Sequence, residues 1–441
     1  MKRKGWLVFG GVFAFVLATQ IQSCAKKDEG TSTSGVTYST TGTTGDYAEW
    51  TVSGSSLTAI WKVTTNTGAI AKTLNVSATC GAADATFGYK VCSVASGTCT
   101  AEPTFTCAAD DAPSAGKQFY MFEVPGVALV VKGKTESGTP DIQEQLHVGL
   151  LKDTSCASIS GDYTFMMTGL KKYELFGIYR TDADFNSVIH ADFGFDNGGT
   201  AASNPTVRYT TGTPNGVESI TGSGCVDGVR VRSIGSGGSA STIRMASTSA
   251  GAFIVDLPSG SGGLVAFKTT NAATIADFAS KTLGGIKFSD DGSEEELIAV
   301  TTGAVTSGSV PITNVALSAD PSPVPNFGHF RPATYTGSWS ASAPSYPNFS
   351  TAPSNYGAVA SGAVISPNVL ASTYANAAAI PGLFVIDSSL FGDTGRVFVI
   401  AMKYNGKLMA FGTTYNHRNQ DENGNPLNNI ANSGTFIVFE K

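Results

Sequence analysis

The sequence has little charge and few histidines. Only 14% of the residues are Asp, Glu, Lys or Arg, the formal net charge is -6, and no basic cluster follows the first four residues. Nucleic-acid binding needs a basic patch, so we exclude nucleic acid as a partner. The four histidines are scattered and no Cys-x-x-Cys pair occurs, so the spacing of a zinc site is also missing. We predict no metal and no cofactor.

Sequence signatures of catalysis are missing as well. No Gly-x-Ser-x-Gly elbow of a serine hydrolase occurs. The paired carboxylates Asp290–Asp291 and Glu294–Glu296 flank Gly292 and Ser293, a combination typical of a solvated hairpin tip. We therefore predict that the protein is not an enzyme. A secreted hydrolase whose site is assembled from distant residues is the enzymatic alternative.

Two acidic segments place oxygen ligands close together, as calcium loops do. They are Asp192–Asn197 and Asp421–Asn425. The second segment has no acidic residue at the twelfth position, and its Asn423-Gly424 pair is itself a turn signal. We interpret it as a turn, with calcium as the alternative.

The N-terminus has the pattern of an export signal. Met1–Lys4 is cationic, and Trp6–Ala18 is an almost continuous apolar stretch. That stretch is shorter than the ~20 residues that a membrane-spanning helix needs. It matches the apolar part of a cleaved signal peptide, so we predict a signal peptide over residues 1–23.

The segment Ile21-Gln22-Ser23-Cys24 resembles the lipobox of bacterial lipoproteins, with an aliphatic residue three positions before the cysteine and a small residue directly before it. The resemblance implies that the Cys24 thiol is acylated and becomes the mature N-terminus. Two or more acyl chains would hold the protein firmly on a membrane. We expect a lipid-anchored protein of the outer membrane or cell surface, and a soluble exported protein is the alternative.

Composition predicts an all-β chain behind a flexible tether. The sequence holds 51 glycines, and its short apolar runs are separated by Gly, Ser and Asn, as in strands joined by turns. Residues 24–46 are rich in Ser, Thr and Gly and contain too little apolar surface for a core. We predict that they form the tether. Very little helix is expected, within Ala272–Lys281 and Leu370–Ala379.

Three similar apolar segments indicate an internal repeat. Pro125–Val131, Gly251–Asp256 and Pro381–Asp387 each contain an early glycine followed by apolar residues. We predict three β modules in tandem, with two larger β domains as the alternative. The predicted modules cover residues 47–157, 158–275 and 276–441.

Sequential hairpins in each module fit an antiparallel β-barrel or a β-sandwich. Ile189–Phe195 alternates between apolar and polar residues, as in a strand with one wet face, whereas Val397–Met402 is apolar on both faces. Asn405-Gly406 predicts a two-residue hairpin turn after that strand. The opening strand of the second module, Gly161–Phe165, resembles that of small calycin-like barrels.

Without Cys24, the seven cysteines leave an even set of six, which indicates disulfides in an exported protein. Cys92 and Cys99 flank Ser93–Thr98, a segment that suits a hairpin tip and would bring the two Cβ atoms together. The predicted pairs are Cys92–Cys99, Cys80–Cys107 and Cys156–Cys225.

An aromatic-rich segment at residues 321–356 is the candidate binding loop. Its rings alternate with prolines and serines, and a long connection of this kind is often functional. The candidate ligand-binding residues are Phe327, Phe330, Tyr335, Trp339, Tyr346, Phe349 and Tyr356. Exposed rings would bind a glycan or a peptide, and packing inside the third module is the alternative.

Together these features predict a membrane-anchored lipoprotein that acts through binding or as a structural component of the cell surface or periplasm. Carriage of a small apolar ligand inside a barrel is the alternative, because an eight-stranded barrel is wide enough to hold one.

Overall fold

Antiparallel strands make up nearly all of the described chain. The computed structural model describes residues 35–134 (except 44), 146–167, 175–196 (except 186), 206–208, 217–234 (except 223), 240–257, 262–289, 295–318, 324–325, 329–332, 335–336, 348–349, 381–387, 396–414 and 434–441. Within these residues the all-β prediction is confirmed. No helix there is long and apolar enough to cross a membrane.

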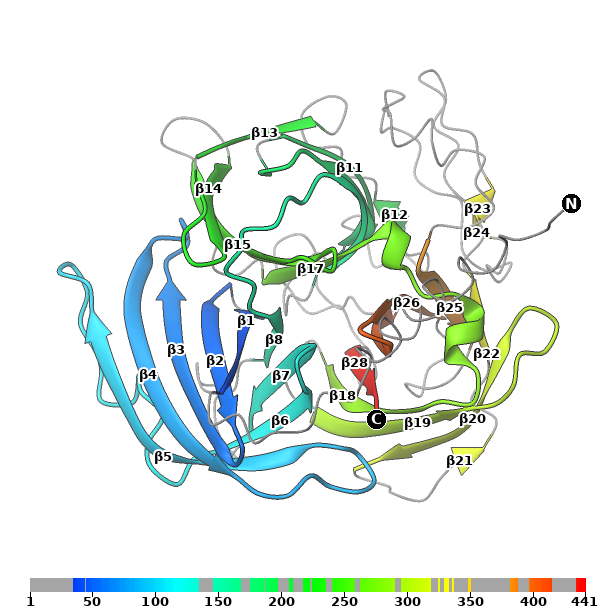
Figure 1. Ribbon diagram of the computed structural model, residues 1–441, viewed down its shortest axis with the longest axis horizontal. Helices are drawn as coiled ribbons and strands as arrows, with labels where there is room; N and C mark the ends of the chain where they lie inside the picture. Colours follow the sequence, from blue (N-terminus) through cyan, green and yellow to red (C-terminus); the bar gives the residue numbers. More distant parts are fainter. Residues whose placement is uncertain are drawn as a thin grey trace, which may run out of the picture. The chain divides into compact units, whose positions relative to one another are not determined.

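The first sheet is a closed barrel in which each strand pairs with its neighbour in sequence and the last strand pairs with the first. Figure 1 shows its first strands side by side in blue to cyan. The strands are β1 (Val36–Gly42), β2 (Tyr47–Ser53), β3 (Ser56–Thr64), β4 (Ile70–Cys80), β5 (Lys90–Ala101), β6 (Gln118–Val124), β7 (Ala128–Gly133) and β8 (Leu146–Leu151).

The second sheet is curled and has nine strands. They are β9 (Gly161–Met167), β10 (Leu175–Thr181), β11 (Ser187–Asp196), β12 (Thr206–Arg208), β13 (Val217–Thr221), β14 (Val229–Ile234), β15 (Ser241–Thr248), β16 (Ala252–Asp256) and β17 (Gly263–Lys268). Strand β10 at one end of the sheet also pairs with β11 near the other end, so the sheet closes on itself. Strand β12 pairs only with β11 among the described strands. Eight of the nine strands therefore form a ring of hydrogen-bonded neighbours.

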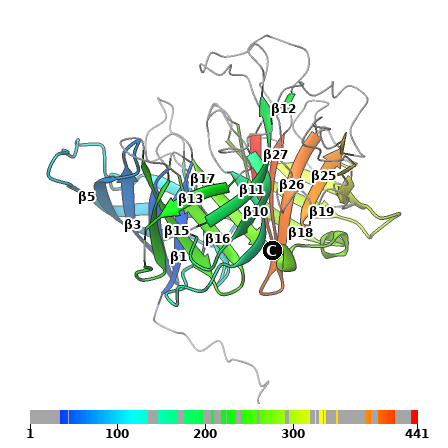
Figure 2. The ribbon, with the colours of Figure 1, turned by 90° about the horizontal axis from the view of Figure 1, so that it is seen from above.

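The third sheet has the same arrangement, and the pairing of β19 with β20 closes it on itself. Figure 2 shows β25, β26 and β27 side by side. The strands are β18 (Thr282–Ser289), β19 (Glu295–Thr302), β20 (Val310–Leu317), β21 (Val324–Pro325), β22 (His329–Pro332), β25 (Leu383–Asp387), β26 (Arg396–Tyr404), β27 (Lys407–Thr414) and β28 (Gly434–Glu440). The short strands β23 (Tyr335–Thr336) and β24 (Asn348–Phe349) form a separate ladder.

Strand β1 lies inside the range predicted for the tether. The Thr-rich composition of this segment suggested a linker, but β-branched threonine also suits a pleated strand. Tyr38 is fully buried, and its hydroxyl donates to Glu123 Oε1 (2.9 Å) and accepts from the Gly126 backbone N–H (2.9 Å). These bonds tie β1 across the barrel, so the tether prediction is wrong from Val36 to Gly42.

Glycines with positive φ precede all three strands of the predicted repeat. Gly126, Gly251 and Gly382 have φ values of 70°, 77° and 75° and open β7, β16 and β25. Strands β7 and β16 are each the seventh strand of their ring, whereas β25 is the fifth of the third ring. The three similar segments therefore occupy the same strand position in the first two rings but a different position in the third.

The predicted hairpin at Asn405-Gly406 is confirmed. The two residues have φ values of 48° and 80°, and they join β26 to β27 through the pair Tyr404 and Lys407. The helix prediction at Ala272–Lys281 is wrong in type, because the segment contains only the 3-10 turn η4 (Ile275–Phe278). Phe278 anchors that turn in the interior of the third barrel. The predicted helix Leu370–Ala379 lies outside the described residues.

Each ring encloses its own apolar interior, because alternate residues of every strand point inward. The first interior includes Trp50, Trp61 and Phe119, the second Phe165 and Phe253. The third includes residues such as Val399 and Phe436. A barrel of eight strands is just wide enough for side chains to fill it.

A further apolar cluster joins the outer faces of all three rings. We call it the shared core, and its members alternate along their strands with inward-pointing residues. Representative members are Val130 and Leu150 of the first ring, Ile254 and Phe267 of the second, and Phe411, Ile437 and Ile400 of the third. Strand β26 gives Ile400 and Met402 to it and Val399 and Ala401 to the third interior, so Val399–Met402 is apolar on both faces, as predicted. Outer faces that would otherwise be exposed hydrophobic patches are thereby removed from water.

We expect the shared core to couple the second and third rings energetically. The centroids of the phenyl groups of Phe267 and Phe411 lie 5.5 Å apart in the shared core. Phe267→Ala and Phe411→Ala should each lower the free energy of unfolding by about 3–5 kcal/mol. The double variant should lose about 0.5–1.5 kcal/mol less than the sum, measured by urea unfolding.

The matched control is Phe267→Ala combined with Phe278→Ala. Phe278 lies inside the third barrel rather than in the shared core. The losses of unfolding free energy caused by Phe278→Ala and Phe267→Ala should therefore be additive. Strict additivity for Phe267 and Phe411 would contradict the coupling.

Candidate functional site

Few of the residues predicted for binding fall in the described part of the chain. Cys24 lies outside it, as do Phe327, Trp339, Tyr346 and Tyr356. Phe330 belongs to strand β22 of the third ring, in register with Val310 and Ile386. Tyr335 and Phe349 stand opposite each other in the β23–β24 ladder. The described part of the aromatic segment therefore consists of short strands, and the binding role of the segment stays a prediction.

Two of the three predicted disulfides are wrong. The structure joins Cys80 to Cys92 and Cys99 to Cys107, whereas Cys156–Cys225 is paired as predicted. Ser93–Thr98 forms no hairpin tip, because Cys92 and Cys99 both lie on strand β5. Seven residue steps along a strand place their Cα atoms about 23 Å apart, which no disulfide spans. Cys80 instead faces Cys92 directly across the β4–β5 ladder.

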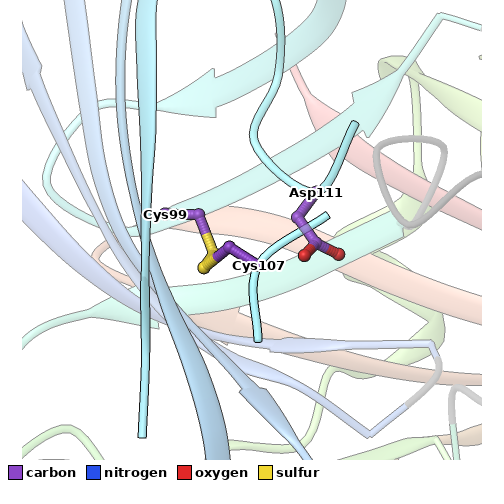
Figure 3. Close-up of side chains that lie close together, drawn as sticks. All are labelled: Cys99, Cys107 and Asp111. Atoms are coloured by element: carbon purple, nitrogen blue, oxygen red, sulfur yellow. A yellow bond between two sulfur atoms is a disulfide. The ribbon is translucent and has the colours of Figure 1, made fainter. Parts of the chain in front are cut away.

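The Cys99–Cys107 disulfide lies beside the carboxylate of Asp111 (Figure 3). Both sulfur atoms are oxidised, and metal ligation by cysteine needs the thiolate. Asp111 accepts hydrogen bonds from the Ala108 backbone N–H and from Lys72 Nζ (2.6 Å). These contacts fasten the loop after β5 to strand β4, so we assign the cluster a structural role.

Only part of the acidic segments named in the sequence analysis falls among the described residues. Asp192 belongs to β11, and Asp421–Asn425 lies outside the described residues. Glu296 belongs to β19 rather than to a turn, and its Oε2 accepts from Lys287 Nζ across the β18–β19 ladder (3.0 Å). Lys287 is buried inside the third ring. The solvated-turn interpretation is therefore wrong for Glu296.

Two buried arginines close one end of the second ring. Arg230 donates to the carbonyl oxygens of Cys156 and Ala157 (2.9 and 2.8 Å). Arg232 donates twice to the carbonyl oxygen of Asp184 (3.1 and 2.8 Å). Burial and the neighbouring Arg230 lower the pKa of Arg232. Arg230 also donates to the Ser247 hydroxyl of β15 (2.9 Å), so the two arginines connect strands and connecting segments at this end of the ring.

His147 is fully buried inside the first barrel, where its ring lies edge-on to Trp61 (4.5 Å between centroids) and Trp50 (5.8 Å). The Thr40 hydroxyl donates to the Ala48 carbonyl oxygen (3.1 Å) and so accepts from His147 Nδ1 (3.2 Å). This geometry assigns the proton of the neutral ring to Nδ1. Burial lowers the pKa of His147 to about 3.

A groove on the outer face of the first barrel is the candidate functional site. Alternation along β2 to β4 places Trp50, Ala59 and Val76 inside and polar residues outside. We call the hollow on this outer face the outer groove, and its volume is about 420 Å³. Its border consists of Thr37, Glu49, Thr51, Thr58, Ile60, Asn75, Ser77, Ser96, Thr98 and Lys152, together with the strand positions of Ala59 and Val76 between them.

Strand register arranges these side chains in rows that cross the sheet. The hydroxyl row consists of directly paired residues on five successive strands, Thr37, Thr51, Thr58, Ser77 and Ser96. The next row contains Glu49, Ile60, Asn75 and Thr98 in the same register. Neighbouring members of a row are about 4.8 Å apart, because that is the spacing of strands in a sheet. The outer groove is thus lined by two ordered rows.

Side chains of the hydroxyl row already interact with one another. The hydroxyls of Thr37 and Thr51 are 2.8 Å apart, and those of Ser77 and Ser96 are also 2.8 Å apart. Each such pair uses one O–H, which leaves the other O–H and several lone pairs for a ligand. Thr58, between the two pairs, is exposed to solvent.

The charges at one edge of the outer groove compensate each other. Lys152 Nζ donates to Glu49 Oε2 (3.0 Å) and to Asp227. Burial opposes the charge on Lys152, but the hydrogen bonds that its ammonium donates to Asp227 and Glu49 outweigh burial and raise the pKa of Lys152. The groove therefore offers a ligand mainly uncharged hydroxyl and amide groups, with Ile60 (47% exposed) as the apolar contact.

Sequence reasoning missed the outer groove. The period-2 alternation of Thr58-Ala59-Ile60-Trp61 and Asn75-Val76-Ser77-Ala78 shows which residues share an outer face. It does not show that Thr58 stands opposite Ser77, because register depends on how the strands pair. The row exists only once five strands are aligned.

We expect His147 to make stability depend on pH. Its pKa is about 3 in the folded protein and near 6.5 when unfolded. The unfolded chain therefore binds the extra proton below about pH 6.5, and stability falls with falling pH. Between pH 7 and pH 5 this should remove about 2 kcal/mol from the free energy of unfolding.

Urea unfolding at pH 7 and pH 5 measures the effect, compared with His147→Phe and His147→Gln. Neither variant has a titrating group at position 147, so the loss of about 2 kcal/mol between pH 7 and pH 5 should disappear in both. The glutamine variant keeps a polar group near Thr40. An equal loss between the two pH values in all three proteins would contradict the assignment.

Comparison of the chain with protein-family models, curated proteins and solved structures found no match. No residue role is therefore transferred from a relative.

Proposed function

We propose that this protein is a lipid-anchored lipoprotein of the cell envelope that binds an uncharged, hydroxyl-rich ligand in the outer groove. The anchor rests on the export signal and the lipobox-like Ile21-Gln22-Ser23-Cys24 segment. The binding role rests on the aligned hydroxyl row, which is the observation that carries the proposal. Carbohydrate is the ligand class with the matching chemistry, because each sugar hydroxyl both donates and accepts hydrogen bonds.

The rigid strands and buried side chains beneath the outer groove favour a role in ligand binding. Its side chains stand on strands rather than loops, and the large side chains of Trp50 and Trp61 pack directly beneath them. Sites built on strands hold their geometry better than sites on loops. Ligand groups would therefore meet hydroxyls that are already in position.

Carriage of a small apolar ligand is the second candidate, and it has less support. Trp50, Trp61, Phe119 and His147 occupy the interior of the first barrel. The described side chains inside the third barrel are also tightly buried. Apolar lipid that co-purifies with the protein and is detected by mass spectrometry would favour carriage.

The lipid anchor predicts that acylation depends on Cys24. Cells that produce the protein and are fed labelled palmitate should incorporate label into the wild type but not into Cys24→Ser. The variant should leave the membrane fraction, because it lacks the acyl chains. Cys156→Ser is unsuitable as the control, since Cys156 is bridged to Cys225; Ser23→Ala keeps a small residue and should remain labelled. Label in Cys24→Ser would contradict the anchor.

The binding role predicts retardation of the protein in native gels that contain hydroxyethyl cellulose, an uncharged polysaccharide. Thr58→Trp places a bulky ring in the outer groove and should abolish retardation. The matched control is Thr79→Trp, which lies on the same outer face but outside the groove. Retardation should persist at high ionic strength, because screening weakens charge interactions only.

Two outcomes would contradict this binding role. One is a wild-type protein that migrates equally in gels with and without the polysaccharide. The other is retardation in alginate, an anionic polysaccharide, that salt removes, because it would assign binding to charge rather than to the hydroxyl row.

A further inference from the structure

We propose that the outer groove holds an extended glycan chain that runs across the strands, along the hydroxyl row. This inference rests on the proposed function and adds the direction and length of the ligand. The row crosses five strands and therefore four strand spacings. Four spacings of about 4.8 Å give a length of about 19 Å. A span of this size exceeds a single sugar and requires several linked units.

The direction follows from how the surface chemistry changes. Across the strands, the row offers a hydroxyl at every step from Thr37 to Ser96. Along strand β3, the outer face changes from Ser56 and Thr58 to Ile60 and then to Lys62. A polymer of repeating units meets the same chemistry at each step only if it lies along the row.

The flanking row supports an uncharged chain. Ile60 stands in register between Glu49 and Asn75. Its exposed side chain offers an apolar surface to the C–H face of a sugar ring, while the Asn75 amide donates and accepts hydrogen bonds. Glu49 is neutralised by Lys152 at the edge of the groove. An acidic glycan would therefore find no free cation along the described hydroxyl row, whereas a neutral one meets complementary groups throughout.

Binding of neutral gluco-oligosaccharides of one to six units to the full-length protein tests the length, by isothermal titration calorimetry. Affinity should rise with each added unit until the chain spans the row and should then level off. A single sugar should bind weakly. Equal affinity for a disaccharide and a hexasaccharide would overturn the extended chain.

Two double variants on the same pair of strands test the direction. Thr58→Val with Ser77→Ala removes a registered pair from the row and should weaken hexasaccharide binding about tenfold or more. Ser56→Ala with Thr79→Val removes the neighbouring registered pair, which lies outside the outer groove, and should leave the affinity unchanged. All four side chains are exposed or half-buried, so both variants should keep the fold.

The outcomes separate the two proposals. If the second double variant weakens binding as much as the first, the chain runs along the strands and this inference fails, while the groove remains the binding site. If neither double variant affects binding and Thr58→Trp still prevents it, the hydroxyl row makes no hydrogen bonds to the ligand. This inference then fails, while the outer groove remains the binding site. If Thr58→Trp also binds normally, the proposed function fails together with this inference.

Discussion

In the shared core, the outer faces of the three rings bury one another's apolar side chains. A barrel that stands alone needs a polar outer face, yet β7 and β16 are buried along their whole length. Residues such as Val130 and Ile254 point away from their own barrel interiors into this common cluster. Exposed singly, these faces would be large apolar patches. Burying them together explains why the chain carries so many strands that are apolar on both faces.

The same constraint separates the two sides of the first barrel. Strands β6, β7 and β8 give their outer residues to the shared core, whereas β2 to β5 carry mainly Ser, Thr and Asn outside. The apolar side joins the barrel to the others and the polar side stays available to a ligand. The packed interior between them, with Trp50 and Trp61, holds the polar side in place. Architecture and candidate site thus arise from one division of the barrel surface.

Local patterns in the sequence predicted the strands but not their partners. Alternation identified the all-β class, and the turn preference of Asn405-Gly406 identified a hairpin, because both are properties of neighbouring residues. Prediction failed at several places where the pairing of strands decided the outcome. Cys92 and Cys99 lie on one strand, and Val36–Gly42 became a strand because Tyr38 is anchored by a residue far along the chain. The hydroxyl row depends on five strands being in register, which no local pattern reveals.

Differential scanning calorimetry of the full-length protein shows whether one core joins the three barrels. Barrels that share a core should unfold together, so we expect one main transition whose calorimetric and van't Hoff enthalpies agree. Ile437→Asp, which places a charge in the shared core, should lower the temperature of that whole transition. Three separate transitions, of which Ile437→Asp shifts only one, would mean that the barrels unfold independently and share no core.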